Sequence, residues 1–112
     1  MTPEQAAQAQ LDAYNARDID AFLLPYARDV VLARLPGDEA FARGHAEMRA
    51  IYGKMFAASP DLHCQLVHRI CHERFVVDHE DVTGIAGRDD RVGAVAIYEV
   101  VDGLIAKAWF LK

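Results

Sequence analysis

The opening segment of the chain has the spacing of an amphipathic helix. Thr2 and Pro3 form a helix-start signal, with a hydroxyl cap followed by a proline at the first helical position. Asp18 can cap a second, shorter helix, and Pro25 ends it because proline lacks the backbone N–H of the helical ladder. Two consecutive helices are therefore predicted before Pro25. The residues that form one face of the first helix are Ala7, Gln10, Leu11 and Tyr14.

A strand and a third helix are predicted next. Residues 28–35 are β-branched and apolar, and the Pro-Gly-Asp turn at residues 36–38 closes them, which favours a strand. Gly44 precedes a third predicted helix, from about residue 45 to residue 58. The apolar positions of this helix recur every three or four residues and are Met48, Ile51, Tyr52, Met55 and Phe56.

The rest of the chain is rich in Val, Ile, Phe and Tyr, which favours strands. Asp102 and Gly103 separate two apolar runs and predict a two-residue hairpin. Helices first and strands later are typical of an α+β fold with an antiparallel sheet. We therefore expect three N-terminal helices packed on a curved sheet, with an enclosed pocket for a small, mostly apolar molecule. The predicted strands cover residues 62–72, 75–84, 92–101 and 104–111.

Composition narrows the class of protein. The 112 residues fit one domain, and the net charge of −5, from 17 acidic and 12 basic residues, argues against a nucleic-acid partner. No apolar stretch is long enough to span a membrane, and the N-terminal residues do not have the pattern of a signal peptide. Two cysteines make no disulfide framework. We expect a cytoplasmic protein with reduced thiols and, since no Gly-rich phosphate loop is present, no cofactor.

Four segments carry a resemblance to a known superfamily: residues 14–22 (YNARDIDAF), 26–32 (YARDVVL), 43–52 (RGHAEMRAIY) and 100–110 (VVDGLIAKAWF). With these segments the chain resembles the nuclear-transport-factor-2-like superfamily, in particular its SnoaL-like and ketosteroid-isomerase-like branches. The resemblance covers nearly the whole chain and implies a single domain over residues 1–112. It implies a cone-shaped α+β barrel with a pocket between helices and sheet, and homodimers packed through the outer sheet face. It names no reaction, since the superfamily includes isomerases, cyclases, dehydratases, hydrolases and non-catalytic modules.

The isomerase branch implies a specific catalytic set, which this chain lacks. The positions that correspond to its helix tyrosine, its general base and its protonated aspartate are Gln10, Arg34 and Ile97. An arginine does not remove a proton from carbon at neutral pH, and an isoleucine does not hold an oxyanion. Ketosteroid isomerase activity is therefore not expected. Tyr52 does fall where that branch keeps a pocket tyrosine.

The densest group of titratable residues lies in the predicted strand 75–84. Alternate side chains of a strand share a face, so Asp78 and Glu80 point to the same side. Two carboxylates held close together in an apolar cone raise at least one pKa, which makes an acid or base for neutral pH. We predict Asp78 and Glu80 as catalytic residues with Arg34 as their cationic partner. The alternative is that the strand simply exposes these charges to solvent, or that they pair with nearby arginines.

Further residues are predicted to bind the ligand. Tyr14 and Tyr52 are assigned this role because a buried phenol needs a hydrogen-bond partner, which a ligand supplies. Glu99 is a second candidate acid, or else a rim charge paired with Lys107 across the last hairpin. The predicted ligand-binding residues are Gln10, Tyr14, Met48, Ile51, Tyr52, Met55, Ile97, Glu99 and Trp109.

A metal site is not expected, although histidines and cysteines cluster in the predicted strand 62–72. Four residues along a strand span about 13 Å, which is too far for one ion with ligand bonds near 2 Å. Cys64, His68 and His72 share a face only as a row. The residues of this cluster are His63, Cys64, His68, Cys71 and His72.

The residues thus leave two hypotheses for function. The first is a cofactor-independent acid–base enzyme that isomerises, dehydrates, cyclises or hydrolyses a small apolar substrate. The second is a non-catalytic binding or dimerisation module that holds an apolar metabolite in the same cone. The first requires at least one carboxylate inside the pocket, whereas the second places carboxylates only at the rim.

Overall fold

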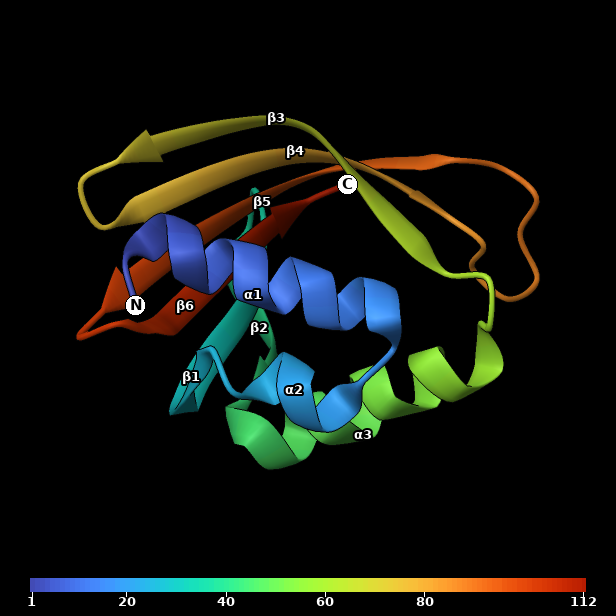
Figure 1. The fold of residues 1–112 in the computed structure, drawn as a ribbon, viewed down its shortest axis with the longest axis horizontal. Helices are drawn as coiled ribbons and strands as arrows, with labels where there is room; N and C mark the ends of the chain where they lie inside the picture. Colours follow the sequence, from blue (N-terminus) through green and yellow to red (C-terminus); the bar gives the residue numbers. More distant parts are fainter.

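Three helices lie on the concave side of a single curved sheet (Figure 1). The computed structural model describes all residues from Met1 to Lys112. The helices are α1 (Pro3–Ala16), α2 (Ile19–Leu23) and α3 (Gly44–Ala58). The strands are β1 (Tyr26–Arg34), β2 (Glu39–Arg43), β3 (His63–His72), β4 (Phe75–Thr83), β5 (Val92–Val101) and β6 (Leu104–Leu111).

The six-stranded sheet is mixed and open. Its strand order is β2-β1-β6-β5-β4-β3, so β2 and β3 are the two edges. The pair β1 and β6 is parallel, and every other pair is antiparallel. The long strands β3, β4 and β5 arch over α1, whereas β1 and β2 descend beside α3 (Figure 1). The curved sheet therefore encloses two sides of a cone, and the helices cover the remaining side.

The helix α1 begins and ends where its sequence signals lie. Thr2 and Gln5 form a reciprocal capping box, and Arg17 closes the helix in the left-handed region with φ of 53°. The buried side chains Ala7, Gln10 and Leu11 face the sheet. This apolar face explains why α1 crosses the concave side of the sheet, where the apolar surface is available.

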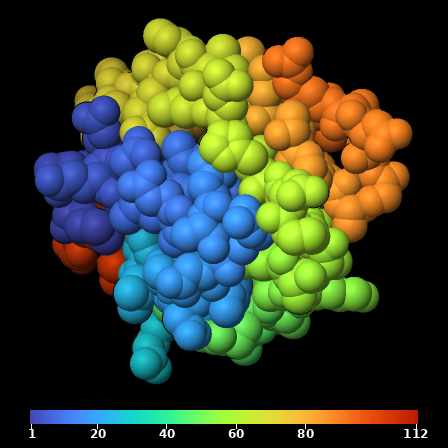
Figure 2. Space-filling view, turned by 45° about the vertical axis from the view of Figure 1, so that its right-hand side comes forward, coloured from blue at the N-terminus to red at the C-terminus, as the bar shows by residue number.

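Aromatic side chains join the three helices to one another. Phe22 of α2 is 1% exposed. Its ring centroid lies 5.9 Å from that of Tyr14 in α1, and 4.9 Å and 5.5 Å from those of Tyr52 and Phe56 in α3. Such tilted and edge-on arrangements are the favoured geometries of aromatic pairs. In the space-filling view α1, α2 and α3 form one continuous surface (Figure 2).

The β4–β5 loop closes one end of the cone. Gly84 has φ of 76°, and a Cβ on it would lie 2.0 Å from the carbonyl oxygen of Asp61, so only glycine fits this contact. The backbone N–H of Ala86 donates to the hydroxyl of the buried Ser59, 3.0 Å away. The loop is therefore attached to the end of α3 rather than extended into solvent.

The expected fold class is confirmed, with differences in detail. Strand β2 was not predicted, because the short segment Glu39–Arg43 has charged ends and little alternation. The hairpin at Asp102 and Gly103 joins β5 to β6 as predicted. None of the helices is long and apolar enough to cross a membrane.

Candidate active site

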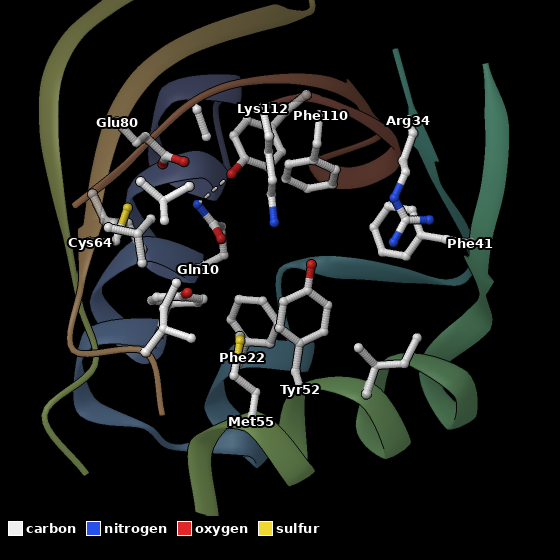
Figure 3. Close-up of a pocket in the computed structure, with 18 of the residues that line it drawn as sticks. Gln10, Phe22, Arg34, Phe41, Tyr52, Met55, Cys64, Glu80, Phe110 and Lys112 are labelled. Atoms are coloured by element: carbon white, nitrogen blue, oxygen red, sulfur yellow. Dashed lines mark hydrogen bonds between the residues drawn. The ribbon is translucent and has the colours of Figure 1, made fainter. Parts of the chain in front are cut away.

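A cavity of about 530 Å³ lies between the helices and the concave face of the sheet (Figure 3). Sixteen of the twenty residues that line it are hydrophobic, so it suits a mostly apolar molecule. The aromatic side chains among them come from both helices and strands. They are Tyr14, Phe22, Tyr26, Phe41, Tyr52, Tyr98 and Phe110.

Glu80 of β4 is the only acidic side chain that lines this cavity. It is 7% exposed and forms no ion pair with any cationic side chain. Burial first, and then the charge of Asp78, raises the pKa of Glu80 to about 7, against smaller contributions of Cys64, Arg69 and Lys112 that lower it. Glu80 is therefore a carboxyl group that can hold or release a proton at neutral pH.

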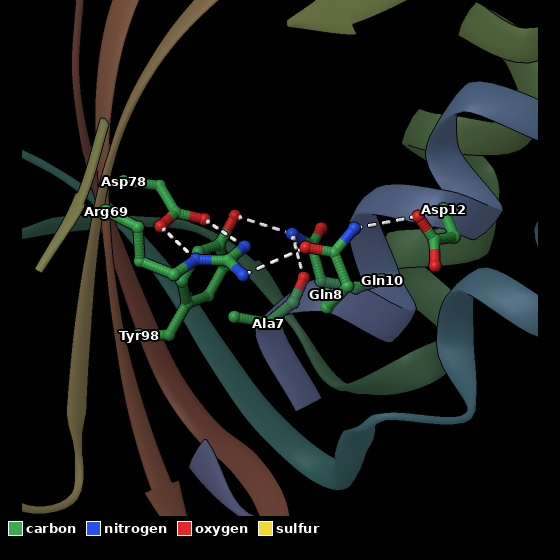
Figure 4. Close-up of polar contacts among 7 residues, drawn as sticks. All are labelled: Ala7, Gln8, Gln10, Asp12, Arg69, Asp78 and Tyr98. Carbon is green, nitrogen blue, oxygen red and sulfur yellow. Dashed lines mark hydrogen bonds and ion pairs between the residues drawn. The ribbon is translucent and has the colours of Figure 1, made fainter. Parts of the chain in front are cut away.

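Asp78 lies on the same face of β4 as Glu80, but it is engaged elsewhere. It is fully buried, and it accepts two hydrogen bonds from Arg69, 2.8 Å to Nε and 3.0 Å to Nη2. Arg69 also donates to Gln8 of α1 at 2.9 Å, and Gln8 donates to Asp12 at 2.8 Å (Figure 4). Asp78 does not line the cavity. It anchors α1 to β3 and β4 through Arg69.

The expected cationic partner of the carboxylates was therefore wrong. Arg69, which the sequence analysis did not select, pairs with Asp78 because the two face each other in the β3–β4 register. Arg34 lies at the opposite end of the cavity, with its Cζ 4.3 Å from the ring centroid of Phe41 (Figure 3). Arg34 forms no ion pair.

A chain of hydrogen bonds places a phenol at the cavity wall. The hydroxyl of Tyr26 donates to Oε1 of Gln10 at 3.2 Å, and Nε2 of Gln10 donates to the hydroxyl oxygen of Tyr98 at 3.0 Å. The same nitrogen donates to the carbonyl of Ala7 at 3.0 Å. These contacts define the orientation of the Gln10 amide, so the proton of the Tyr98 hydroxyl remains available for an acceptor in the cavity. Burial raises the pKa of Tyr98 far above its usual range, which keeps it protonated.

The structure brings five of the predicted ligand-binding residues together around the cavity. They are Gln10, Tyr14, Ile51, Tyr52 and Met55. Burial raises the pKa of Tyr14 and Tyr52 well above the usual range, so both phenols are hydrogen-bond donors at neutral pH. Met48 does not line the cavity: it is fully buried among other side chains of the hydrophobic core.

Three other predicted ligand-binding residues lie on the outer face of the sheet. In β5 the side chains of Ala94, Ala96 and Tyr98 point inward, so Ile97 and Glu99 point away from the cavity. A shift of one residue along a strand moves each side chain to the opposite face of the sheet. The alignment of β5 to the isomerase branch was therefore wrong by one residue. Glu99 pairs with Arg74 at 2.8 Å rather than with Lys107.

Trp109 of β6 also lies on the outer face of the sheet and not, as predicted, in the cavity. It faces Ile97 in the register, and its indole N–H donates to Asp38 at 2.9 Å, outside the cavity. Lys107 also pairs with Asp38, at 3.1 Å.

Several lining residues were missed by the sequence analysis. Cys64 was considered only as part of the metal row, and Tyr26, Phe41 and Tyr98 were not assigned to the pocket. Lys112 follows the last strand, and its amino group points into the cavity (Figure 3). The small residues Ala94 and Ala96 leave room for α1 on the concave face of the sheet. Because Tyr98 alternates in phase with them, this pattern could have placed Tyr98 on the cavity side.

The histidines and cysteines of β3 are spread along the strand. Cys64 is buried and faces the cavity, whereas Cys71 is exposed. No three His, Cys, Asp or Glu side chains lie close enough together to hold one ion.

Comparison with known proteins identifies relatives of this domain. The family model of the SnoaL-like domain matches residues 7–108. No protein of curated function has significant sequence similarity to the chain.

Solved structures share the fold at low sequence identity. An uncharacterised cystatin-fold protein from Novosphingobium aromaticivorans has a TM-score of 0.91 and 22% identity, over 100% of this chain and 99% of its own. A candidate ketosteroid isomerase from Kribbella flavida has a TM-score of 0.82 and 21% identity, over 97% of this chain and 76% of its own. AclR from Streptomyces galilaeus, a candidate hydroxylase, has a TM-score of 0.78 and 20% identity, over 96% of this chain and 76% of its own. At these identities the likeness concerns the fold.

Proposed function

Because the chain belongs to the SnoaL-like domain family, we propose that it is an acid–base enzyme acting on a small, mostly apolar molecule. Glu80 is the residue that takes up and returns the proton. The fold is shared with candidate isomerase and hydroxylase proteins, which agrees with a catalytic use of the cavity.

One observation carries this proposal. Glu80 is the only carboxyl group in a cavity of about 530 Å³, and no cation pairs with it. Its pKa of about 7 allows both the carboxylic acid and the carboxylate at neutral pH. A general acid or base works best when its pKa lies near the working pH.

Tyr98 supplies the second part of the chemistry. When Glu80 removes a proton from a carbon next to a carbonyl group, the C–H electron pair moves onto the carbonyl oxygen. The available hydroxyl proton of Tyr98 can hydrogen-bond to that oxygen and stabilise its negative charge. Return of the proton from Glu80 to the same or a neighbouring carbon completes an isomerisation and restores the carboxylate.

A second candidate function is binding without turnover. The observation in its favour is the predominance of hydrophobic residues, 16 of 20, around the cavity. In this case Glu80 would only accept or donate a hydrogen bond to the ligand.

Exchange of carbon-bound hydrogen with solvent separates the two functions. The ketone 2-tetralone, which has acidic hydrogens next to its carbonyl group, is incubated with the protein in D₂O, and deuterium incorporation is followed by ¹H NMR. We expect the protein to accelerate exchange and Glu80→Gln to lower the enzymatic rate by about 10²- to 10⁴-fold. Glu99→Gln is the matched control, because Glu99 lies on the outer face of the sheet.

Two results would contradict the enzyme proposal. Binding of 2-tetralone without accelerated exchange supports the non-catalytic module. Accelerated exchange that persists in Glu80→Gln assigns the chemistry to another group.

A further inference from the structure

The charged groups of the cavity are separated along its length. Glu80 lies at one end, and Arg34 lies at the other (Figure 3). Lys112 also lines the cavity, with its amino group directed inward. Arg34 and Lys112 form no ion pair, and both are solvent-exposed residues whose side chains also line the cavity.

Arg34 is held in place without using its hydrogen-bonding groups. It is the exposed last residue of β1, and its Cζ lies 4.3 Å from the ring centroid of Phe41. Stacking on an aromatic face leaves the N–H groups at the edge of the guanidinium free. Its register partner on β2, Glu39, forms no ion pair with it. The N–H groups of Arg34 therefore have no acceptor within the protein.

Tyr52 of α3 adds a hydroxyl group between these ends. The hydroxyl points into the cavity (Figure 3), and its pKa is raised first by burial and then by Glu80, whereas the charge of Arg34 lowers it. A guanidinium, an ammonium and a phenol thus line a cavity whose only acidic side chain, Glu80, lies at the end opposite Arg34. The guanidinium and the ammonium only donate hydrogen bonds and carry positive charge, so an anionic acceptor suits them best.

We propose that the natural ligand is an amphipathic carboxylate: an apolar ring system or chain with one carboxylate group at its end. The carboxylate binds Arg34, Tyr52 and Lys112, and the apolar body fills the aromatic part of the cavity and reaches Glu80. This assignment of the reacting end rests on the proposed function. The separation of charges makes Arg34 a binding residue and leaves Glu80 free for proton transfer.

Two fluorescent probes with the same aromatic skeleton test this proposal. One is 8-anilino-1-naphthalenesulfonate, whose sulfonate stands in for the carboxylate, and the other is N-phenyl-1-naphthylamine, which lacks the anionic group. Fluorescence titration is expected to give a lower Kd for the sulfonate. Arg34→Gln is expected to raise the Kd of the sulfonate by about tenfold and to leave that of the amine unchanged, because a hydrogen bond to a charged group is lost.

Arg28→Gln is the matched control, since it removes the same charge from an exposed arginine that does not line the cavity. Unchanged binding of the neutral amine shows that Arg34→Gln has kept the fold. Equal affinity for both probes, no binding of the sulfonate, or equal weakening of both probes by Arg34→Gln would overturn the proposal.

Glu80→Gln separates this proposal from the proposed function. Preference for the sulfonate is expected to persist in Glu80→Gln, whereas hydrogen exchange on 2-tetralone is expected to be lost. If the preference is absent but Glu80-dependent exchange is present, only the carboxylate proposal fails. If the preference is present without exchange, the carboxylate proposal stands and the enzyme proposal fails.

Discussion

Arg69 binds the carboxylate of Asp78 through two hydrogen bonds, with Nε 2.8 Å from Oδ1 and Nη2 3.0 Å from Oδ2. Asp78 is fully buried, and it is two residues from Glu80 on the same face of β4. The pair therefore anchors α1 to the sheet and also places a negative charge beside the carboxyl group that lines the cavity. Asp78 influences the site through Glu80 and is not itself at the cavity wall.

Asp78→Asn is expected to lower the pKa of Glu80. The substitution removes the anion that raises this pKa, and it leaves the cation of Arg69 uncompensated nearby. Both changes favour the Glu80 carboxylate. Titration of the side-chain carboxyl ¹³C signals measures the shift, with Glu80→Gln to assign the signal. An unchanged or higher pKa would contradict the role given to Asp78, and Glu99→Gln is the control expected to have no effect.

Asp78→Asn is also expected to lower the free energy of unfolding by about 3–5 kcal/mol, because it leaves the guanidinium of Arg69 without its counter-charge. Arg69 has only 9% of its side chain exposed. The double variant Arg69→Met with Asp78→Leu removes both charges and is expected to recover most of the loss. Urea unfolding measures both changes, and a loss of under 1 kcal/mol for Asp78→Asn would show that the pair does not anchor α1.

Ionisation of Glu80 is expected to make the protein less stable as the pH rises. The pKa is about 7 in the folded protein against 4.5 for an ordinary glutamate, so the folded state holds this proton more tightly than the unfolded state does. Stability due to this group is present below about pH 4.5, falls between pH 4.5 and 7, and is constant above, a loss of up to about 3 kcal/mol. The measurement is the difference in unfolding free energy between the native protein and Glu80→Gln as a function of pH. A difference that does not vary with pH would rule out the raised pKa.

The two thiols are expected to react very differently with Ellman's reagent. Cys71 is exposed, whereas Cys64 is buried and has its pKa raised by burial and by Glu80. One thiol per chain should react in the folded protein and two in urea. Cys71→Ser should then show no rapid reaction. Rapid reaction of the Cys71→Ser variant would show that the cavity opens to solvent.

We propose that the outer face of the sheet pairs with a second copy of the chain, as family resemblance implied. No helix covers this face (Figure 1), and Ile70 and Leu111 are 53% and 44% exposed. Light scattering is expected to give twice the chain mass of 12.5 kDa. Ile97→Asp, on this face, should yield monomers, and Leu24→Asp, at a residue 72% exposed on the helical side, should not. A monomeric native protein would refute this arrangement.

Much of the fold was predictable because its signals are local. The cap at Thr2, the helical spacing through Tyr14 and the turn at Asp102 and Gly103 each act within a few residues. The short edge strand β2 was not predictable in this way, because it forms by pairing with β1 rather than through a pattern of its own.

The candidate site was predictable only in part. Glu80, Tyr14 and Tyr52 were selected from residue type and spacing, and all three line the cavity. Ile97 and Glu99 were placed on the wrong face, because strand alternation gives two phases and the sequence pattern around them does not distinguish the phases.

By itself, the sequence determined the order of the helices and the long strands, and the presence of two carboxylates on one strand face, since each depends on neighbours along the chain. Only the tertiary structure decided that Arg69 pairs with Asp78 and that Glu80 is left alone in the cavity. That choice depends on the register between β3 and β4 and on the burial created by α1, which are contacts between residues far apart in the chain. The difference between two adjacent carboxylates of the same strand is therefore a property of their surroundings in space.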